Sequence, residues 1–473
     1  MSERGRDRTH VVIAGGGVAG LEALLALHAL AGHVVDLTLV APEPKFLYRP
    51  VTVAEAFDRG EARSWPLAEL VADRCAGRLH RGSLAEVRAA EHTAVLDSGE
   101  RIAFDVLVLA VGAVMLESLQ SALNFRGRED VPALRLLLGE LVEGSVRSVA
   151  FALPAGHVWP LPLYELALMS AAYLRDRGAR KAQIHLITPE REPLELFGPE
   201  TGRAIAPLMQ ARDIVLHCSS LAAHVEGRAV RLAGGARVAA DRVVTLPKLE
   251  GPRVLGLPHD ARGFIAVDVH GRVRGVSDVF AAGDATAFPL KQGGLAAQQA
   301  DAAAEQIASD AGVAVDARPF MPVLRGLLLT GGAPLYLRAE PQRLPRSSSV
   351  AIEMPPRWRS RKRASLAAGQ PLWWPPAKIA GRHLAPFLAT ARPDLLGSET
   401  LADRVPVPSA SVSDDEREDA LELALLLADA DAQWGDYRSA LDALDAAEAL
   451  RGTLPPELEA KRRAWRAAHQ LGD

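Results

Sequence analysis

"HVVIAGGGVAGLEALLALHAL", residues 10–30, decides the fold class. Its apolar start predicts a buried strand, its glycines predict a tight turn, and its leucine- and alanine-rich end predicts a helix. The apolar run 34–40 predicts the next strand. Gly15, Gly17 and Gly20 have the spacing GxGxxG, in which the first glycine permits the turn, the second lets a pyrophosphate approach the backbone, and the third lets helix and strand pack closely. The stretch therefore predicts a Rossmann-type unit whose helix N-terminus faces a dinucleotide phosphate.

An acidic residue that binds ribose usually follows the second strand of such a unit, about 20 residues after the glycine turn. Here that place falls at Ala41, which has no carboxylate. Glu43 lies two residues further on and is the candidate replacement. The alternative is that Glu43 is an ordinary surface residue.

Two later apolar stretches predict further buried strands. "FDVLVLAVGA" (104–113) ends in small residues and glycine, which suits either backbone lying against a cofactor or a central parallel strand. "DVFAAGDATAFP" (278–289) contains Gly283 and Asp284 and precedes a glycine turn that opens a small-residue helix. The Asp284 carboxylate is suited to accept hydrogen bonds from sugar-alcohol hydroxyls, or alternatively to cap a helix.

The strand expected at 148–153 and the helix expected at 163–174 are joined by a proline-rich turn, where a second glycine-rich phosphate loop would be expected. Pro160 and Pro162 have no N–H, so a pyrophosphate finds fewer donors there. Binding of NAD(P)H at this turn is therefore doubtful, although another route of entry stays open. Tyr164, in the following helix, is interpreted as a packing residue.

Composition limits the functional classes. The 473 residues suggest about three domains, and the net charge of −4 from well-mixed signs does not indicate nucleic acid as a partner. The purely apolar run 106–116 is shorter than the roughly 20 residues of a membrane-spanning helix. The polar start without an apolar signal core predicts a cytoplasmic protein. Cys75 and Cys218 have neither CxxC nor metal-ligand spacing, so we expect two reduced thiols and no metal site.

The motifs together resemble the pyridine nucleotide-disulfide oxidoreductase superfamily, flavoproteins with two dinucleotide-binding domains. They are similar to the branch that holds sulfide:quinone oxidoreductase, flavocytochrome c sulfide dehydrogenase and type II NADH dehydrogenase. The stretches that carry the resemblance are "VVIAGGGVAGLEA" (11–23), "KFLYRP" (45–50), "LVLAVGA" (107–113) and "VFAAGDATAFPLKQGGLAAQQA" (279–300).

The resemblance implies a bound FAD, with the glycine loop at the pyrophosphate, Asp284 at the ribityl chain and the turn 291–294 near the pyrimidine end of the ring. The cofactor-binding residues that it implies are Gly15, Gly16, Gly17, Ala19, Gly20, Glu43, Arg49, Pro50, Ala110, Gly112, Gly283, Asp284, Gln292, Gly293 and Gly294.

Three residues are catalytic candidates beside this flavin. Lys291 would place a cation near the flavin and stabilise its reduced form, or alternatively it reaches solvent. Trp159 would stack near the isoalloxazine and His157 would handle protons near neutral pH, or they are a packing residue and a solvated loop residue. The sulfide-oxidising relatives carry a cysteine close to the position of Trp159 and a partner thiol after that of Asp284. This chain has neither, which puts sulfide chemistry in doubt.

The C-terminal region is expected to cover the flavin and to form a contact. Trp373 and Trp374 with Lys378 and Arg382 indicate a docking surface, and a basic cluster precedes them: Arg357, Arg359, Arg361, Lys362 and Arg363. Basic residues beside tryptophans are typical of a peripheral membrane contact; the alternative is a solvated loop with a packed lid.

The tail contains a stretch, 421–450, that resembles one tetratricopeptide unit, with Ala428, Gly435, Tyr437, Ala440 and Ala447 at its small or aromatic positions. The alternative is a chance similarity of an alanine-rich hairpin. Helices are expected near 416–433, 436–450 and 456–469. A single unit cannot bury its own apolar face, so residues 416–470 are expected to dock on the body, on a second subunit or on a protein partner.

These observations predict an α/β protein with two Rossmann-like domains, an α/β C-terminal region and a short α-helical tail. The FAD domain is discontinuous (8–120 and 256–312) around a NAD(P)-like domain (121–255), followed by an interface or lid region (313–397) and the tail (413–473). The expected function is FAD-dependent electron transfer without redox cysteines, with a small molecule or a quinone as carrier. The alternatives are a type II NAD(P)H dehydrogenase at the inner face of the membrane, and a flavin-binding scaffold whose tail recruits a partner.

Overall fold

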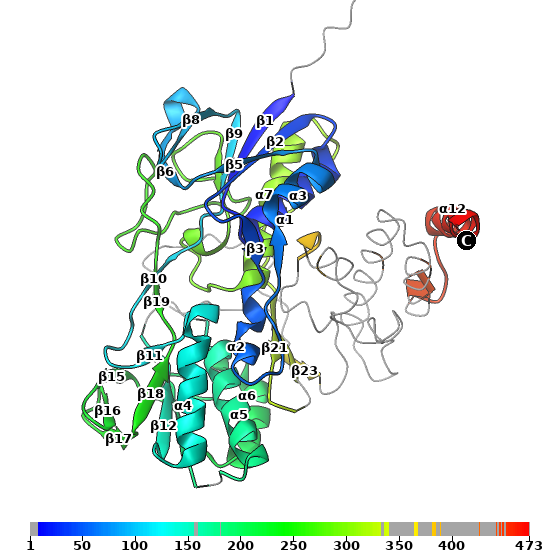
Figure 1. Cartoon of the computed structure of the whole chain (residues 1–473). Coiled ribbons are helices and arrows are strands. Elements are labelled where there is room, and N and C mark those ends of the chain that lie inside the picture. Colours follow the sequence, from blue (N-terminus) through cyan, green and yellow to red (C-terminus); the bar gives the residue numbers. More distant parts are fainter. Residues whose placement is uncertain are drawn as a thin grey trace, which may run out of the picture. The chain divides into compact units, whose positions relative to one another are not determined.

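The computed structural model describes residues 8–155, 159–179, 181–332, 335–339, 364–367, 381–384, 388, 425, 441, 444–445, 447–448 and 451–472. The chain divides into two compact units, residues 1–366 and 367–473. The first unit contains two parallel five-stranded sheets, so the predicted α/β class with two Rossmann-like domains is confirmed (Figure 1).

The first sheet has the strand order β20-β9-β1-β2-β5, and all its pairs are parallel. Its apolar strands are buried on both faces, because α1 and α7 cover one face and the antiparallel sheet β6-β7-β8 packs on the other. The elements are β1 (Thr9–Ala14), α1 (Val18–Ala31), β2 (Val35–Ala41), β5 (Arg78–Arg81), β6 (Leu84–Arg88), β7 (Thr93–Leu96), β8 (Arg101–Ala103), β9 (Val106–Leu109), β20 (Val279–Ala281) and α7 (Gly293–Asp310).

The second sheet has the order β11-β18-β12-β13-β14 and repeats this plan. Helices α4, α5 and α6 pack on one face, and the small antiparallel sheet β15-β16-β17 packs on the other. The elements are β11 (Leu123–Asn124), α4 (Val131–Glu143), β12 (Ser148–Ala152), α5 (Leu161–Asp176), β13 (Gln183–Ile187), α6 (Pro199–Gln210), β14 (Ile214–His217), β15 (Ala222–Val225), β16 (Ala229–Leu232), β17 (Arg237–Ala239) and β18 (Arg242–Thr245).

Two further segments lie outside the five-stranded sheets. The antiparallel pair β10 (Val114–Leu116) and β19 (Lys248–Glu250) carries the chain into the second domain and back. An excursion after β2 contains β3 (Lys45–Leu47), α2 (Thr52–Glu55), β4 (Ser64–Pro66) and α3 (Leu67–Glu69), and a π-helical turn over Leu70–Arg74 leads into β5.

The strands are shorter than the apolar stretches that predict them. Within 104–113 only β9 is a strand, because Gly112 has φ +76° and turns the chain away. Within 278–289 only β20 is a strand, because Gly283 also has φ +76° and starts a 3₁₀ turn over Gly283–Ala285. Both turns lie at the same edge of the sheet as the glycine loop, since all three follow the carboxyl ends of neighbouring parallel strands.

After α7 the chain forms β21 (Leu324–Leu328), β22 (Leu335–Ala339) and β23 (Ala364–Ala367). In the second unit α12 spans Pro456–Gly472, in place of the expected helix 456–469. Arg462 of α12 donates to Asp445 at 2.7 Å and to Glu448 at 2.7 Å, which holds α12 against the preceding segment. The tryptophans Trp373 and Trp374, Lys378 and the basic cluster 357–363 lie outside the described residues, as do four of the five tetratricopeptide positions.

Candidate cofactor site

Gly15, Gly17 and Gly20 of the first turn have different surroundings. Gly15 has φ +123°, and a Cβ built on it would lie 2.2 Å from the carbonyl oxygen of Ala110. A Cβ on Gly20 would lie 1.8 Å from the carbonyl oxygen of Gly15. A Cβ on Gly17 meets no protein atom within 4 Å. Gly15 and Gly20 are therefore required by the fold itself, whereas Gly17 faces an open space.

Helix α1 presents free amides to this space. Gly17 is its N-cap, and the first bond inside the helix runs from Leu21 N to Gly17 O at 2.9 Å. The amides of Val18, Ala19 and Gly20 have no acceptor within the described part of the chain, as expected for a first helical turn. Three free donors at the positive end of a helix fit an anionic pyrophosphate. A Cβ built on Gly16 would lie 2.8 Å from Cδ1 of Leu67. The side chain of Glu43, past β2, is exposed.

The third motif packs directly on the first. A Cβ on Gly283 would lie 3.1 Å from Cβ of Ala19 in α1 and 3.3 Å from Cβ of Ala296 in α7. Gln299 Oε1 accepts from Gly283 N at 2.7 Å, which fixes the turn that presents Asp284. The small residues thus bring the two helix starts together, so Asp284 and the glycine loop belong to one site.

Lys291 and Asp284 are coupled charges in this site. Lys291 is 4% exposed, its Nζ donates to Thr286 O, and the same atom lies 4.0 Å from the ring centroid of Phe264. Burial lowers the pKa of Lys291 to about 8, against the opposing effect of Asp284. Burial raises the pKa of Asp284, against the opposing effect of Lys291. The lysine is therefore an enclosed cation, not one that extends into solvent.

The start of α7 is fixed by its own cap. Gln292 Oε1 accepts from Leu295 N at 2.8 Å, and its Nε2 donates to Arg325 O of β21 at 3.0 Å. Gly294 O accepts from Gln298 Nε2 at 3.0 Å. The side chain of Gln292 is therefore engaged by protein groups, which leaves the backbone of the turn 291–294 as the part available to a ligand.

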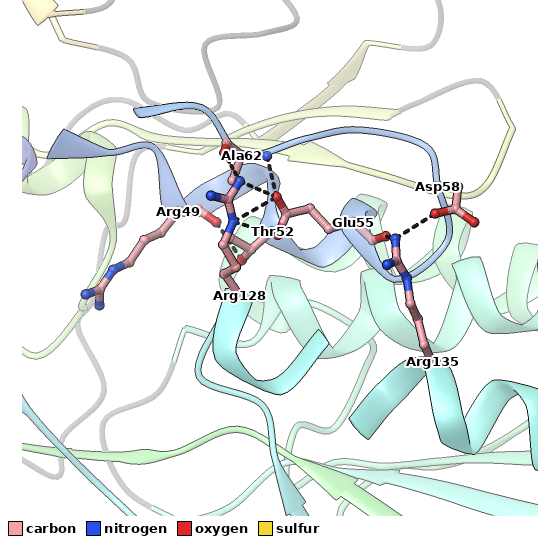
Figure 2. Close-up of polar contacts among 7 residues, drawn as sticks. All are labelled: Arg49, Thr52, Glu55, Asp58, Ala62, Arg128 and Arg135. Carbon is pink, nitrogen blue, oxygen red and sulfur yellow. Dashed lines mark hydrogen bonds and ion pairs between the residues drawn. The ribbon is translucent and has the colours of Figure 1, made fainter. Parts of the chain in front are cut away.

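The segment that holds Arg49 and Pro50 is anchored on the second domain. The buried Glu55 accepts from Ala62 N at 2.7 Å and from Arg128 Nη2 at 2.7 Å (Figure 2). Arg135 Nη2 donates to Glu55 O at 2.6 Å and to Asp58 at 2.6 Å. Figure 2 shows the Arg49 side chain pointing away from this cluster. Arg49 is exposed and has no ion pair within the described residues, so its charge is available to a ligand.

The proline-rich turn takes a different course. Trp159 is partly buried and packs edge-on against Phe197, with ring centroids 5.7 Å apart. This contact accounts for the indole as a packing residue, and its stacking on a flavin stays a prediction. His157 lies outside the described residues.

The two cysteines lie outside the sheets, in different Rossmann units. Cys75 follows the π-helical turn that leads into β5, and Cys218 follows β14 of the second sheet. Burial raises the pKa of Cys75 to about 12 and also raises that of Cys218. Both thiols are therefore poor nucleophiles at neutral pH, and neither belongs to the cluster around Gly17 and Asp284.

Sequence reasoning missed one polar pair. Tyr164 of α5 is fully buried, and its hydroxyl donates to Glu190 Oε2 at 2.6 Å. Glu190 follows β13 by three residues, the place of a ribose-binding acid in a Rossmann unit. An acidic residue shortly after the second strand, the signal that points to Glu43 in the first domain, points to Glu190 in the second.

Two searches of the described residues were negative. None of the described helices is long and apolar enough to cross a membrane. No group of three or more His, Cys, Asp and Glu side chains in the described part of the chain is arranged to hold a metal ion.

Comparisons with known proteins agree with this geometry. Residues 166–306 match the family model described as pyridine nucleotide-disulphide oxidoreductase. The chain is 28% identical to demethylphylloquinone reductase NdbB of Synechocystis sp., over 59% of this chain and 72% of that protein. It is 27% identical to the ferredoxin reductase component of a Cupriavidus sp. chlorobenzene dioxygenase, over 60% of this chain and 69% of that protein.

Among solved structures, the sulfide:quinone oxidoreductase of Aquifex aeolicus superposes with a TM-score of 0.65 at 23% identity, covering 70% of this chain and 84% of that one, which shows the shared fold. Members of the matched family are FAD-dependent oxidoreductases that commonly use NAD(P)H. The glycine loop, the Asp284 turn, the family match over residues 166–306 and the relatives named above are together consistent with the pyridine nucleotide-disulfide oxidoreductase superfamily.

Proposed function

We propose that this protein passes electrons through a bound FAD directly to a small carrier, without a cysteine intermediate. The observation that carries the proposal is the contrast between the glycine loop and the two cysteine thiols. The glycine loop presents open space and free amides for the flavin nucleotide, whereas both cysteines are protonated at neutral pH and lie elsewhere.

A quinone is the carrier that we favour. One relative is named as a reductase of demethylphylloquinone, which supports this class of acceptor. FAD would supply the ability to accept electrons as a pair and release them, and the chain would hold it at Gly17, Asp284 and the turn 291–294. Lys291 would favour the reduced cofactor through its enclosed positive charge.

A stopped-flow experiment tests the proposal. The FAD-loaded enzyme is reduced anaerobically with light, a catalytic amount of a deazaflavin and EDTA as the electron donor, and is then mixed with a short-chain ubiquinone or with menadione. We expect the flavin absorbance to return rapidly, at a rate proportional to quinone concentration or saturating with it. Reoxidation by quinone no faster than that of free reduced FAD would contradict the proposal. Because EDTA supplies the electrons, this experiment does not depend on any physiological donor.

A further inference from the structure

The two Rossmann units can be compared turn by turn from their helix caps. Gly17 is the N-cap of α1 and Pro160 is the N-cap of α5. Three residues later, Gly20 in α1 therefore corresponds to Leu163 in α5. Gly17 is exposed and open, whereas Pro160 is buried. Gly20 has no room for even a Cβ, whereas Leu163 carries a whole fully buried side chain. The start of α5 consequently cannot pack as the start of α1 does.

The start of α5 also has few donors to offer. Pro160 and Pro162 have no N–H, and the amide of Leu163 already donates to Pro160 O at 3.0 Å. Leu161 supplies the one free amide of residues 160–163, within the described structure. The first turn of α1 supplies three. Residues 160–163 therefore offer no cluster of backbone donors to a pyrophosphate.

The ribose end of the second domain is occupied by the protein itself. Glu190 Oε2 accepts from Tyr164 at 2.6 Å and from Thr188 Oγ1 at 2.8 Å, and Leu194 N donates to the Tyr164 hydroxyl at 3.3 Å. The phenol thus occupies the place where a ribose hydroxyl would donate to the acid. The corresponding residue of the first domain, Glu43, is exposed.

The charge around this position also opposes a phosphorylated ribose. Glu190, Glu192 and Glu195 all act on Cys218 as negative charges that raise its pKa. The guanidinium of Arg191 donates to Glu195 Oε1 from Nε at 2.9 Å and from Nη2 at 2.5 Å. A 2′-phosphate would therefore be repelled by these carboxylates, and none of residues 190, 191, 192 and 195 offers it a free cation.

We propose that Tyr164 and Glu190 close the adenosine end of the second Rossmann domain, so that this domain binds no nicotinamide adenine dinucleotide. The donor then reaches the flavin without help from the adenosine half of a dinucleotide. This closure concerns the electron donor of the proposed function, and it rests on that function only because the kinetic test follows the absorbance of bound FAD. Tyr164 and Glu190 are specificity residues in this account, because they exclude one class of donor.

A pair of donors tests the closure in the wild-type, FAD-loaded protein. Flavin bleaching is followed anaerobically with NADH and with reduced nicotinamide mononucleotide, which lacks the adenosine half. We expect second-order rate constants within about threefold of each other and no saturation, since no adenosine binding energy is available. A rate with NADH that saturates and exceeds the mononucleotide rate by about a hundredfold would overturn the proposal.

A binding measurement assigns the closure to Tyr164 without using flavin chemistry. Saturation-transfer NMR is used with adenosine, which needs the ribose position but no phosphate cradle. We expect no transfer in the wild type, saturable transfer in Tyr164→Ala, and none in Tyr173→Ala, the same truncation in the same helix. If Tyr164→Ala does not fold, Tyr164→Leu replaces it in the experiment. Its leucine side chain still packs in the core but is too short to reach Glu190. Transfer in the wild type, or its absence from a folded Tyr164 variant, would overturn the assignment. Failure of the quinone experiment with light-reduced enzyme would instead reject the proposed function.

Discussion

Arg128 binds the buried carboxylate of Glu55 through Nη2 and Oε1 at 2.7 Å, although 73 residues separate the two in the chain. Glu55 belongs to the excursion after β2 in the first domain, and Arg128 stands at the entrance to α4 in the second domain. Arg128 also donates to Ala62 O, so one guanidinium binds two points within the excursion, Glu55 and Ala62 (Figure 2). The pair therefore fixes the position of Arg49 and Pro50 relative to the second sheet.

Loss of this pair is expected to loosen the excursion. Arg128→Met leaves the Glu55 carboxylate buried with only the Ala62 amide and should destabilise the protein by about 1–3 kcal/mol, a value reduced because the Arg128 side chain is partly exposed. Thermal unfolding measures the cost. Arg126→Met is the matched control, because Arg126 pairs with Asp130 inside its own turn. Equal melting temperatures for Arg128→Met and the wild type would show that the clamp contributes nothing.

Gly17→Val should abolish FAD binding and leave the fold intact. The added side chain meets no protein atom near its Cβ, so it enters only the space assigned to the pyrophosphate. Absorbance of the purified protein reports bound flavin, and circular dichroism reports folding. Gly139→Ala is the control, since that helical glycine also has open space around its Cβ, and it should stay yellow. A yellow Gly17→Val protein would refute the assignment of the loop.

Lys291→Met should lower the flavin reduction potential, because it removes an enclosed positive charge. The pKa of Lys291 is lowered to about 8, so the wild-type lysine is charged below that pH and loses its charge as the pH rises through it. The difference in potential between wild type and Lys291→Met is therefore expected to be largest at pH 7 and to disappear by about pH 9–10. Lys248→Met, which removes a partly exposed lysine paired with Glu250, is the control. A potential that is the same in both proteins at pH 7 would leave Lys291 without this role.

The histidine pair of the second sheet should make the protein sensitive to acid. His185 Nδ1 lies 3.2 Å from His217 Nε2, and burial lowers the pKa of both rings. The unfolded chain therefore binds protons more readily than the folded one, and stability should fall as the pH drops from about 7 through the lowered values. His217→Asn should reduce this loss between pH 7 and pH 5, whereas the exposed His224→Asn should not. Parallel unfolding curves for all three proteins across this range would refute the assignment.

The sequence predicts the parts of the site that depend on local pattern. The glycine spacing identifies the turn at Gly15–Gly20, and the prolines identify positions 160 and 162 as lacking amide donors. Lys291 stands out because only seven of the 54 lysine and arginine residues are lysines. Its enclosure against Phe264, however, follows from the packing of distant segments.

The contacts that the sequence does not predict all join distant segments. Tyr164 is interpreted as a packing residue from its helical position, and it is indeed buried, but its hydrogen bond to Glu190 depends on how α5 lies beside β13. The pairing of Glu55 with Arg128 likewise depends on the excursion reaching the second domain. No periodicity of apolar residues contains this information, because charged partners leave no spacing signal when they come from different elements.

An anaerobic titration with dithionite tests the central claim, that the flavin works without a cysteine partner, most directly. We expect complete bleaching with two electron equivalents per FAD, no long-wavelength band from a thiolate beside the flavin, and the same result in the Cys75→Ala/Cys218→Ala variant. Uptake of four equivalents by the wild type, with two of them lost in that variant, would show a redox-active disulfide and contradict the account.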